Sequence, residues 1–182
     1  MNNKHFIKFL SYAVKLKEIK RSGWSKAGIK NPESVADHVY GLAVLSMLIS
    51  DLKGLNAEKM FRLAVIHDLE EAILGDLTSE EKKKENNLKT LEEKAIKKVL
   101  SSLPLNLKQK YYSLWLEYKN ASSKEAKLIK ELDKLEMVLQ ALLYEEKFNL
   151  NLEEFWETAE NEIENLKDFL ITLKLMRKLK RS

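Results

Sequence analysis

Four polar residues stand where the surrounding sequence is apolar. His38 lies inside an apolar stripe, the pair His67-Asp68 follows an uninterrupted apolar segment, and Asp133 lies close to Leu132 and Leu135. A buried carboxylate is costly unless a cation or hydrogen bonds compensate it. Two imidazoles and two carboxylates are a set that a divalent ion would satisfy. Manganese, cobalt, iron, zinc and magnesium all suit such ligands, and the residue types do not select among them.

Each of these signals also has an ordinary structural interpretation. A single core histidine is commonly a hydrogen-bonded structural residue, and a mid-helix Asp133 beside Lys134 could form an ion pair. His5, the third histidine, falls in an amphipathic N-terminal segment without a partner motif, and we expect it to be structural. The sequence matches neither a P-loop, a dinucleotide fingerprint, a HExxH zinc motif nor a G-x-S-x-G elbow.

The four residues are spread over three predicted helices. The first is expected to have Pro32 near its first turn and to end at Gly54; its stripe, with steps of three and four residues, comprises Val35, His38, Leu42, Leu45 and Ile49. The second opens after Asn56, a suitable N-cap, and is expected to run through His67 towards Gly75. The third, which carries Asp133, extends from Ser122 or Ser123 to about residue 147.

Few helix breakers interrupt the rest of the chain, which has five glycines and two prolines. Further helices are expected over residues 3–19, 91–103, 111–118 and 151–179, and loops over 21–32 and 76–86. No alternating strand pattern and no internal repeat is present. We therefore expect an all-α fold, a single compact bundle of about six to seven helices that forms one domain over residues 1–182.

Composition restricts the class of protein. The 182 residues are 45% hydrophobic and 33% charged, with a net charge of +4 and no cysteine, which excludes disulfides and cysteine-ligated zinc. No apolar run approaches the roughly 20 residues that span a bilayer, and the first residues lack a signal-peptide pattern. We expect a cytoplasmic protein without a membrane partner. The basic cluster at 174–181 is expected to be a solvated helix end rather than a nucleic-acid site.

The order His38, His67-Asp68, Asp133 resembles the HD-domain superfamily of metal-dependent phosphohydrolases. Four segments are similar to its 5′-deoxynucleotidase branch: KRSGW (20–24), PESVADHVYGLA (32–43), AVIHDLEEAILGDLT (64–78) and LWLEYKNASSKEAKLIKELDKLEMVLQALLYE (114–145). The resemblance covers nearly the whole chain, least clearly residues 79–110 and 157–182. It implies hydrolysis of the 5′-phosphate of (deoxy)nucleoside monophosphates, with one divalent metal ion as cofactor, and a homodimer.

The resemblance also implies roles for individual residues. His38, His67, Asp68 and Asp133 match the metal ligands. Glu71 matches a residue that transfers a proton in this family, and Asp76 matches a residue that positions or activates the attacking water. Arg21 would grip the phosphate, Trp24 would crowd the sugar, and Thr78 would border the substrate. In one bacterial form of the family the Arg and Trp are adjacent, whereas here Ser22 and Gly23 separate them.

The residues with implied catalytic and substrate-binding roles also have structural interpretations. Glu71 follows His67 by four residues, so both are expected on one helical face, although Glu71 or Glu70 could pair with a lysine. Asp76 could be a turn residue, Arg21 a solvated side chain, and Trp24 a core anchor.

Two other classes of function remain open. HD-domain enzymes also hydrolyse guanosine tetraphosphate (ppGpp), deoxynucleoside triphosphates (dNTPs) and cyclic dinucleotides, but the chain lacks the extra domains and ligand histidines of several such classes. Alternatively, the chain could be a non-catalytic binding module whose metal is structural, or a weak nucleic-acid binder. Its aromatic residues between 111 and 118 fall at helical spacing, which favours a core role over base stacking.

Overall fold

The computed structural model describes residues 3–181, and the side chains of Ser79 and Arg181 lie outside that description. These residues form eleven helices: α1 (Asn3–Lys15), α2 (Ser22–Lys26), α3 (Val35–Lys53), α4 (Ala57–Ile66), α5 (Glu71–Leu74), α6 (Ser79–Lys84), α7 (Leu88–Leu100), α8 (Leu105–Lys119), α9 (Lys124–Phe148), α10 (Glu153–Glu162) and α11 (Lys167–Arg181). The all-α prediction is confirmed. The predicted number of helices was too low, because two expected loops contain α2 and α6 and two expected helices are each divided.

The predicted helix over residues 151–179 is divided into α10 and α11 by a side chain from another helix. One carboxylate oxygen of Glu131 on α9 accepts the backbone N–H groups of Glu164, Asn165 and Leu166, at 3.1, 2.7 and 3.2 Å. Backbone N–H groups at a helix start lack partners within the helix, and an anion there also interacts favourably with the helix dipole. The carboxylate therefore stabilises the break and ties α11 to α9.

The predicted helix from Asn56 to Gly75 was wrong in its second half. α4 ends at Ile66, and residues 67–70 form a tight turn before the four-residue α5. The backbone bonds Leu69 N–Ile66 O and Glu71 N–Asp68 O span three residues, as in a 3₁₀ turn. His67 and Glu71 therefore do not share one face of a regular helix, although both side chains are buried.

The start and end of α3 fix the position of His38, which lies in its first turn. Ser34 is the N-cap: its side chain accepts from Asp37 N, and the Asp37 carboxylate accepts from Ser34 N, which completes a capping box. Pro32 lies two residues before this cap, near the first turn as expected. Gly54 ends α3 in the left-handed conformation, at φ 63°, as the sequence predicts.

α3 is also long and apolar enough to cross a membrane by length and composition, contrary to the sequence expectation. Core helices of globular proteins pass the same test, so the finding is weak evidence for a span; 39% of the tested window is buried in the fold. One face of α3 remains exposed and is apolar, with Tyr40, Val44, Met47, Leu48 and Leu52.

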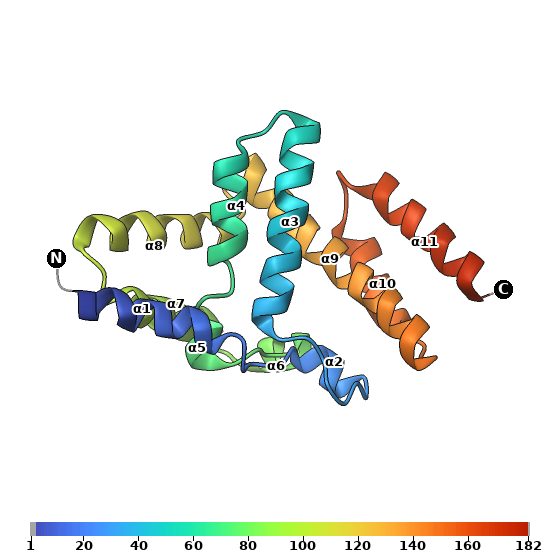
Figure 1. The fold of residues 1–182 in the computed structure, drawn as a ribbon, viewed down its shortest axis with the longest axis horizontal. Coiled ribbons are helices and arrows are strands. Elements are labelled where there is room, and N and C mark those ends of the chain that lie inside the picture. The colour runs from blue at the N-terminus through green and yellow to red at the C-terminus, as the bar shows by residue number, and fades with distance from the viewer. Residues whose placement is uncertain (1–2, 182) are drawn as a thin grey trace.

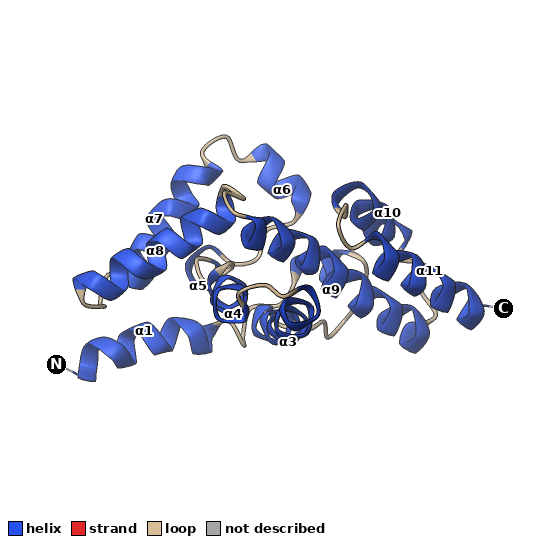
Figure 2. Ribbon diagram, turned by 90° about the horizontal axis from the view of Figure 1, so that it is seen from above, coloured by secondary structure: helices blue, strands red, loops and turns tan. Residues whose placement is uncertain are grey.

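The helices are arranged around a central pair. α3 and α4 lie side by side, with α1, α7 and α8 on one side and α10 and α11 on the other, so that the two chain ends lie far apart (Figure 1). The long α9 contacts α3, α4, α8, α10 and α11, and it links the two sides (Figure 2).

Two clusters of buried apolar residues correspond to this division. One gathers side chains mainly from α3, α4, α9, α10 and α11; the other gathers them mainly from α5, α7 and α8, with partly buried residues of α1 packed against it. The end of α4 joins them, because Leu63 and Ala64 belong to the first cluster and Ile66 and Leu69 to the second. The His67-Asp68 turn therefore lies at their junction, where burial holds it in place.

The basic cluster of α11 is partly docked against the fold rather than solvated. Arg177 is buried, donates to both carboxylate oxygens of Glu145 at 2.7 and 2.8 Å, and lies over the ring of Trp156. Lys174 and Lys180 pair with Glu160 and Glu146. Most of this positive charge is thus matched by carboxylates of the same chain.

Candidate metal centre

In each of the two core histidines, Nδ1 is hydrogen-bonded to the protein, which leaves Nε2 as the ring atom available for a ligand. Nδ1 of His67 lies 2.7 Å from the carbonyl oxygen of Ala64, and Nδ1 of His38 lies 2.5 Å from Oε2 of Glu136. A carbonyl or an ionised carboxylate only accepts, so each Nδ1 carries the hydrogen. Nε2 of both rings is buried and forms no hydrogen bond of regular geometry; carboxylate oxygens of Asp133 and Asp68 approach the two atoms, to 3.1 Å from His38 and 2.8 Å from His67. When neutral, both imidazoles thus offer an Nε2 lone pair.

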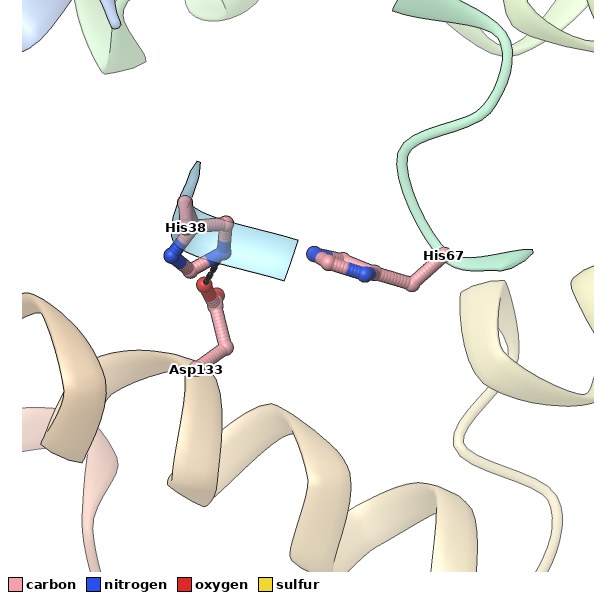
Figure 3. Close-up of side chains that lie close together, drawn as sticks. All are labelled: His38, His67 and Asp133. Carbon is pink, nitrogen blue, oxygen red and sulfur yellow. Dashed lines mark ion pairs between the residues drawn. The ribbon is translucent and has the colours of Figure 1, made fainter. Parts of the chain in front are cut away.

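Asp133 completes a group of three ligand atoms. Its Oδ1 lies 3.1 Å from His38 Nε2, and the donor atoms of His38, His67 and Asp133 lie within 4.8 Å of one another. Figure 3 shows the three side chains converging from α3, from the turn after α4 and from α9. Unpartnered imidazole nitrogens facing a carboxylate fit a divalent cation. The sequence prediction that these residues meet is therefore confirmed.

The electrostatics of the group favour positive charge. Burial and Arg21 act to lower the pKa of His38, but the neighbouring carboxylates of Asp133 and Glu136 outweigh them and raise this pKa to about 9. Burial likewise acts to raise the pKa of Asp133, but Lys134 and His38 hold it well below the ordinary value. Without a metal ion, a proton on His38 partly occupies the role that a cation would have.

Asp68 borders this group and connects it to Arg21. Its Oδ2 lies 2.8 Å from His67 Nε2 and 3.8 Å from a guanidinium nitrogen of Arg21. The same guanidinium nitrogen lies 3.6 Å from Asp76. Burial works against the charge of Arg21, but Asp76, Asp133 and Asp68 raise its pKa, so that it stays a cation. Arg21 thus lies beside the candidate ligands rather than in solvent.

A cleft of about 490 Å³ opens over these residues. Asp68, Asp76 and Asp133 lie in it together with cationic side chains from several elements: Arg21, Lys26, Lys82, Lys119, Lys130 and Lys134. α10 contributes Phe155 and Thr158 to its wall. A cleft that combines carboxylates with many cations can hold a metal ion and an anionic ligand at once.

Glu71 and Glu70 have different surroundings. Both oxygens of Glu70 are engaged, by Trp115 Nε1 at 2.8 Å and Lys119 Nζ at 2.5 Å. Glu71 is also buried, but its Oε2 has no partner and Lys82 lies 3.7 Å from its Oε1. Burial, with Asp68 and Asp76, raises the pKa of Glu71 well above the ordinary value. Burial also raises the pKa of Glu70, but of the two only Glu71 has a buried carboxylate oxygen without a partner.

Asp76 and Thr78 both hold local structure around the cleft. Oδ2 of Asp76 accepts from the backbone N and the side-chain hydroxyl of Ser22, at 2.5 and 2.7 Å, and so fixes the start of α2 behind Arg21. Thr78 is the N-cap of α6 and forms a capping box with Glu81. Both residues line the cleft, but their polar atoms are already in use.

Trp24 borders the cleft mainly as a fixed core residue. It is 1% exposed, its ring stacks on Phe155 with centroids 4.2 Å apart, and its Nε1 donates to Glu33 at 2.8 Å. The structural alternative for Trp24 thus holds, while a contact between its ring and a sugar stays a prediction.

Comparison with known proteins agrees with this geometry. Residues 13–169 match the HD domain family. The chain belongs to the HD-domain family. Curated relatives include the 5′-deoxynucleotidases HDDC2 of Mus musculus, 38% identical over 84% of this chain and 77% of the relative, and of Homo sapiens, 41% identical over 77% and 68%. The 5′-deoxynucleotidase hdd1 of Schizosaccharomyces pombe is 40% identical over 79% and 74%. This HD-domain chain therefore lies in the branch of these proteins.

Solved structures share the arrangement of helices. The PH0347 protein of Pyrococcus horikoshii OT3 is 34% identical with a TM-score of 0.79, over 92% of this chain and 97% of that one. A conserved hypothetical protein of Pyrococcus furiosus is 37% identical with a TM-score of 0.74, over 96% and 98%. A predicted metal-dependent phosphohydrolase of Magnetospirillum magnetotacticum, 21% identical with a TM-score of 0.74 over 97% and 93%, supports the fold alone.

The structure adds residues of this HD-domain site that the sequence did not single out. Glu136 contacts His38, and Tyr118 lies edge-on to the ring of His67 with centroids 5.2 Å apart. Lys130 lies over the ring of Tyr118 at 5.1 Å. In the sequence, only helical spacing could have indicated Lys130 and Glu136, which lie three residues before and three residues after Asp133 on α9.

Proposed function

We propose that this chain is a metal-dependent 5′-deoxynucleotidase, which hydrolyses deoxynucleoside monophosphates to nucleoside and inorganic phosphate. The observation that carries the proposal is the convergence of the buried Nε2 atoms of His38 and His67 on carboxylate oxygens, with Asp133 within 4.8 Å of both, beside a cleft rich in cations. The relatives named 5′-deoxynucleotidase, 38–41% identical, support the substrate class.

The proposed ligands of one divalent ion are His38, His67, Asp68 and Asp133. When bound, such an ion supplies Lewis-acid polarisation of the phosphoryl group and lowers the pKa of water. Manganese, cobalt, iron, zinc and magnesium all suit this donor set. The remaining chemistry falls to side chains of the cleft.

Arg21 would bind the phosphate. Its guanidinium is a planar, permanently charged fork suited to two phosphate oxygens, and Asp68 and Asp76 already orient it from 3.8 and 3.6 Å. Asp76 would position the phosphate-binding loop through its bonds to Ser22, and it lines the cleft in which the proposed hydrolysis would take place.

Glu71 would transfer the proton. In hydrolysis, a water oxygen bonds to phosphorus while the bond from phosphorus to the 5′ oxygen breaks, and the water's proton must reach that leaving oxygen. Oε2 of Glu71 is buried without a partner, and a raised pKa suits a group that accepts a proton and returns it.

The sugar would lie against the wall formed by Trp24, Phe155 and Thr78. Because Trp24 is held by stacking and by Glu33, it cannot move aside easily for a larger sugar. A rigid aromatic wall supports a preference for deoxyribose over ribose, and this preference is part of the proposal.

A crossed panel of substrates and metals tests the proposal. Metal-stripped protein is assayed for phosphate release from deoxy- and ribonucleoside monophosphates with each of the five metals. Deoxynucleotides should be the best substrates, and only with added metal. Guanosine tetraphosphate, deoxynucleoside triphosphates and cyclic dinucleotides form the comparison arm. If one of these is preferred, or nothing is hydrolysed, the nucleotidase proposal is wrong.

A ligand substitution tests the site itself. Asp68→Asn should lower kcat/KM more than about 100-fold, since ligand loss should exceed the 10- to 100-fold cost of losing an outer partner. Circular dichroism should show an unchanged helix content. Asp51→Asn, on the exposed end of α3, is the matched control. Activity retained by Asp68→Asn would remove Asp68 from the proposed site.

The proposed active form is a homodimer. The exposed apolar face of α3, together with Phe61 and Val65 of the neighbouring α4, is the kind of patch that subunit interfaces cover. Sedimentation velocity should give a dimer, and Leu48→Glu should give a monomer. Leu175→Glu, an equally exposed position on α11, should leave the dimer intact. A monomeric wild-type protein would contradict the proposal.

A further inference from the structure

Glu136 is a buried carboxylate that contacts both His38 and Gly41. Its Oε2 lies 2.5 Å from His38 Nδ1, and only 7% of the residue is exposed. A Cβ atom at position 41 would lie 2.7 Å from Glu136 Oε1 and 3.3 Å from its carboxyl carbon. Gly41 lies within α3, where an alanine would favour the helix. Glycine at this position thus leaves room for the carboxylate at the expense of helix propensity.

We propose that Glu136 is a positioning residue, which holds the His38 ring so that Nε2 faces the metal, and that Gly41 is required to admit its carboxylate. The inference rests on the proposed function, since it concerns the same metal centre. It adds a residue to that site which touches neither the metal nor the substrate.

The physical reason lies in the two nitrogens of one ring. A carboxylate accepts but does not donate, so Glu136 fixes the hydrogen on Nδ1 and leaves Nε2, 3.1 Å from Asp133 Oδ1, as the ring atom that can bind the same cation as Asp133. Ligating histidines commonly need such an outer partner, which orients the ring and raises its basicity. Ala64 supplies a carbonyl oxygen to His67 for the same purpose. Of the two partners, only Glu136 can be altered by substitution.

The surroundings hold Glu136 in this place. Glu33 lies beside it, and ligand atoms of Glu33, His38 and Glu136 lie within 4.8 Å of one another. Trp24 Nε1 donates to Glu33 at 2.8 Å, while the Glu33 backbone donates to Tyr144 OH at 2.7 Å. Glu33 is thus tied to other partners, so the Nδ1 hydrogen is left to Glu136.

A double-substitution cycle tests the arrangement. Affinity for Mn²⁺ and Co²⁺ is measured by calorimetry for the wild type, Glu136→Ala, Gly41→Ala and the double variant. Glu136→Ala should weaken binding about 10- to 100-fold. Gly41→Ala should also weaken it, because the new Cβ displaces the carboxylate. The double variant should bind no more weakly than Glu136→Ala, since the carboxylate is already gone. Additive losses would overturn the role given to Gly41.

Two further variants separate positioning from folding. Glu136→Gln keeps an oxygen that accepts from Nδ1, and should retain most of the affinity. Ser46→Ala, also buried on α3, bonds only to Leu42 of its own helix and should leave affinity unchanged. Thermal unfolding of the metal-free proteins reports stability independently. If Glu136→Ala lowers the melting temperature but not the affinity, the residue is merely structural and the proposal is wrong. Two bound ions per chain in the wild type, with one lost in Glu136→Ala, would make Glu136 a ligand and would also overturn it.

A readout without metal distinguishes this inference from the proposed function. In proton NMR, His38 Nδ1–H should give a downfield signal that exchanges slowly in the wild type and in Glu136→Gln, and that is lost in Glu136→Ala. If the wild type binds no divalent ion, the proposed function fails, while loss of this signal still supports the hydrogen bond from His38 to Glu136. An unchanged signal in Glu136→Ala would overturn the inference whatever the metal data.

Discussion

At the scale of single residues, the candidate centre consists of ligands surrounded by a second layer of charged side chains. Asp133 pairs with Lys134 at 3.2 Å, Asp68 with Arg21 at 3.8 Å, and His38 with Glu136 at 2.5 Å. Each charge that would contact a metal or a phosphate is thus already oriented by a neighbour. Pre-oriented groups lose little entropy when a ligand binds.

Arg21 permits a direct test of phosphate binding. Arg21→Lys should lower kcat/KM about 10- to 100-fold, because an ammonium cannot reproduce a two-oxygen contact worth about 1.5–3 kcal/mol. Steady-state kinetics with a deoxynucleoside monophosphate measures the effect. Arg62→Lys is the matched control, since Arg62 pairs with Glu58 on the same helix, away from the cleft. Equal kinetics for Arg21→Lys and the wild type would show that Arg21 does not contact the phosphate.

Glu33 predicts a pH-dependent stability. Burial and the neighbouring Glu136 raise its pKa from 4.5 to about 6. The folded protein therefore holds this proton more tightly than the unfolded chain, and the resulting stabilisation, complete below pH 4.5, is lost as the pH rises through about 6. In metal-free protein, Glu33→Gln should raise the melting temperature at pH 8 by about 2–4 °C, equivalent to about 1 kcal/mol after solvent screening.

The same substitution should have little effect on stability at pH 4, where Glu33 is protonated. Melting curves at the two pH values provide the comparison, with Glu157→Gln on the exposed side of α10 as control. A constant difference between Glu33→Gln and the wild type would contradict the raised pKa.

At the scale of elements, short pieces of backbone position the side chains with proposed catalytic roles. α2 has five residues, α5 four and α6 six. Helices of this length are not stable by themselves and depend on caps and packing. Asp76 fixes α2 and Thr78 fixes α6, so residues expected to contact the substrate also stabilise these elements.

Thr78 can be tested as a cap. Thr78→Ala removes the capping box and should cost about 1 kcal/mol locally. Hydrogen exchange over residues 79–84 should become faster, and KM should rise because Lys82 of α6 borders the cleft. Thr78→Ser keeps the box and should resemble the wild type in both measurements. Faster exchange without a change in KM would mean that α6 does not contribute to substrate binding.

The extent of what could be predicted from sequence differs between elements. His38, His67, Asp68 and Asp133 could be singled out because a polar residue within an apolar pattern needs a partner. α3 and α9 could be predicted because their stripes are long and their caps, Ser123 and Gly54, are common ones. These signals are local, so they can be recognised in the sequence without knowledge of the tertiary contacts.

The remaining features depend on contacts between distant residues. The break between α10 and α11 depends on Glu131, 34 residues before Asn165, and no local pattern at 163–166 marks it. Glu136 resembles an exposed helical glutamate until α3 and α9 are packed together. The turn at 67–70 follows apolar residues that continue a helical pattern, so periodicity alone extended α4 too far.

At the scale of the whole molecule, α9 organises both the cleft and the C-terminal helices. Asp133, Glu136 and Lys130 point into the centre or the cleft, whereas Glu131 and Glu145 of the same helix hold α11 and its Arg177. Asp133 and Glu131 are only two residues apart. A rotation of α9 would therefore change metal binding and the seating of α11 together.

The carboxylate of Glu131 at the join of α10 and α11 has a consequence for inactivation by heat. Three backbone N–H groups depend on that one side chain, and α10 supplies Phe155 and Thr158 to the cleft wall. Glu131→Ala should therefore release α10 and α11 from α9 well below the temperature at which the rest of the bundle melts. Turnover should then decay at a temperature where most of the far-ultraviolet ellipticity remains. If turnover and ellipticity are lost together, α10 and α11 open only when the whole protein unfolds. The useful lifetime of the enzyme would thus be set by a sub-global opening of α10 and α11, which carry none of the proposed metal ligands.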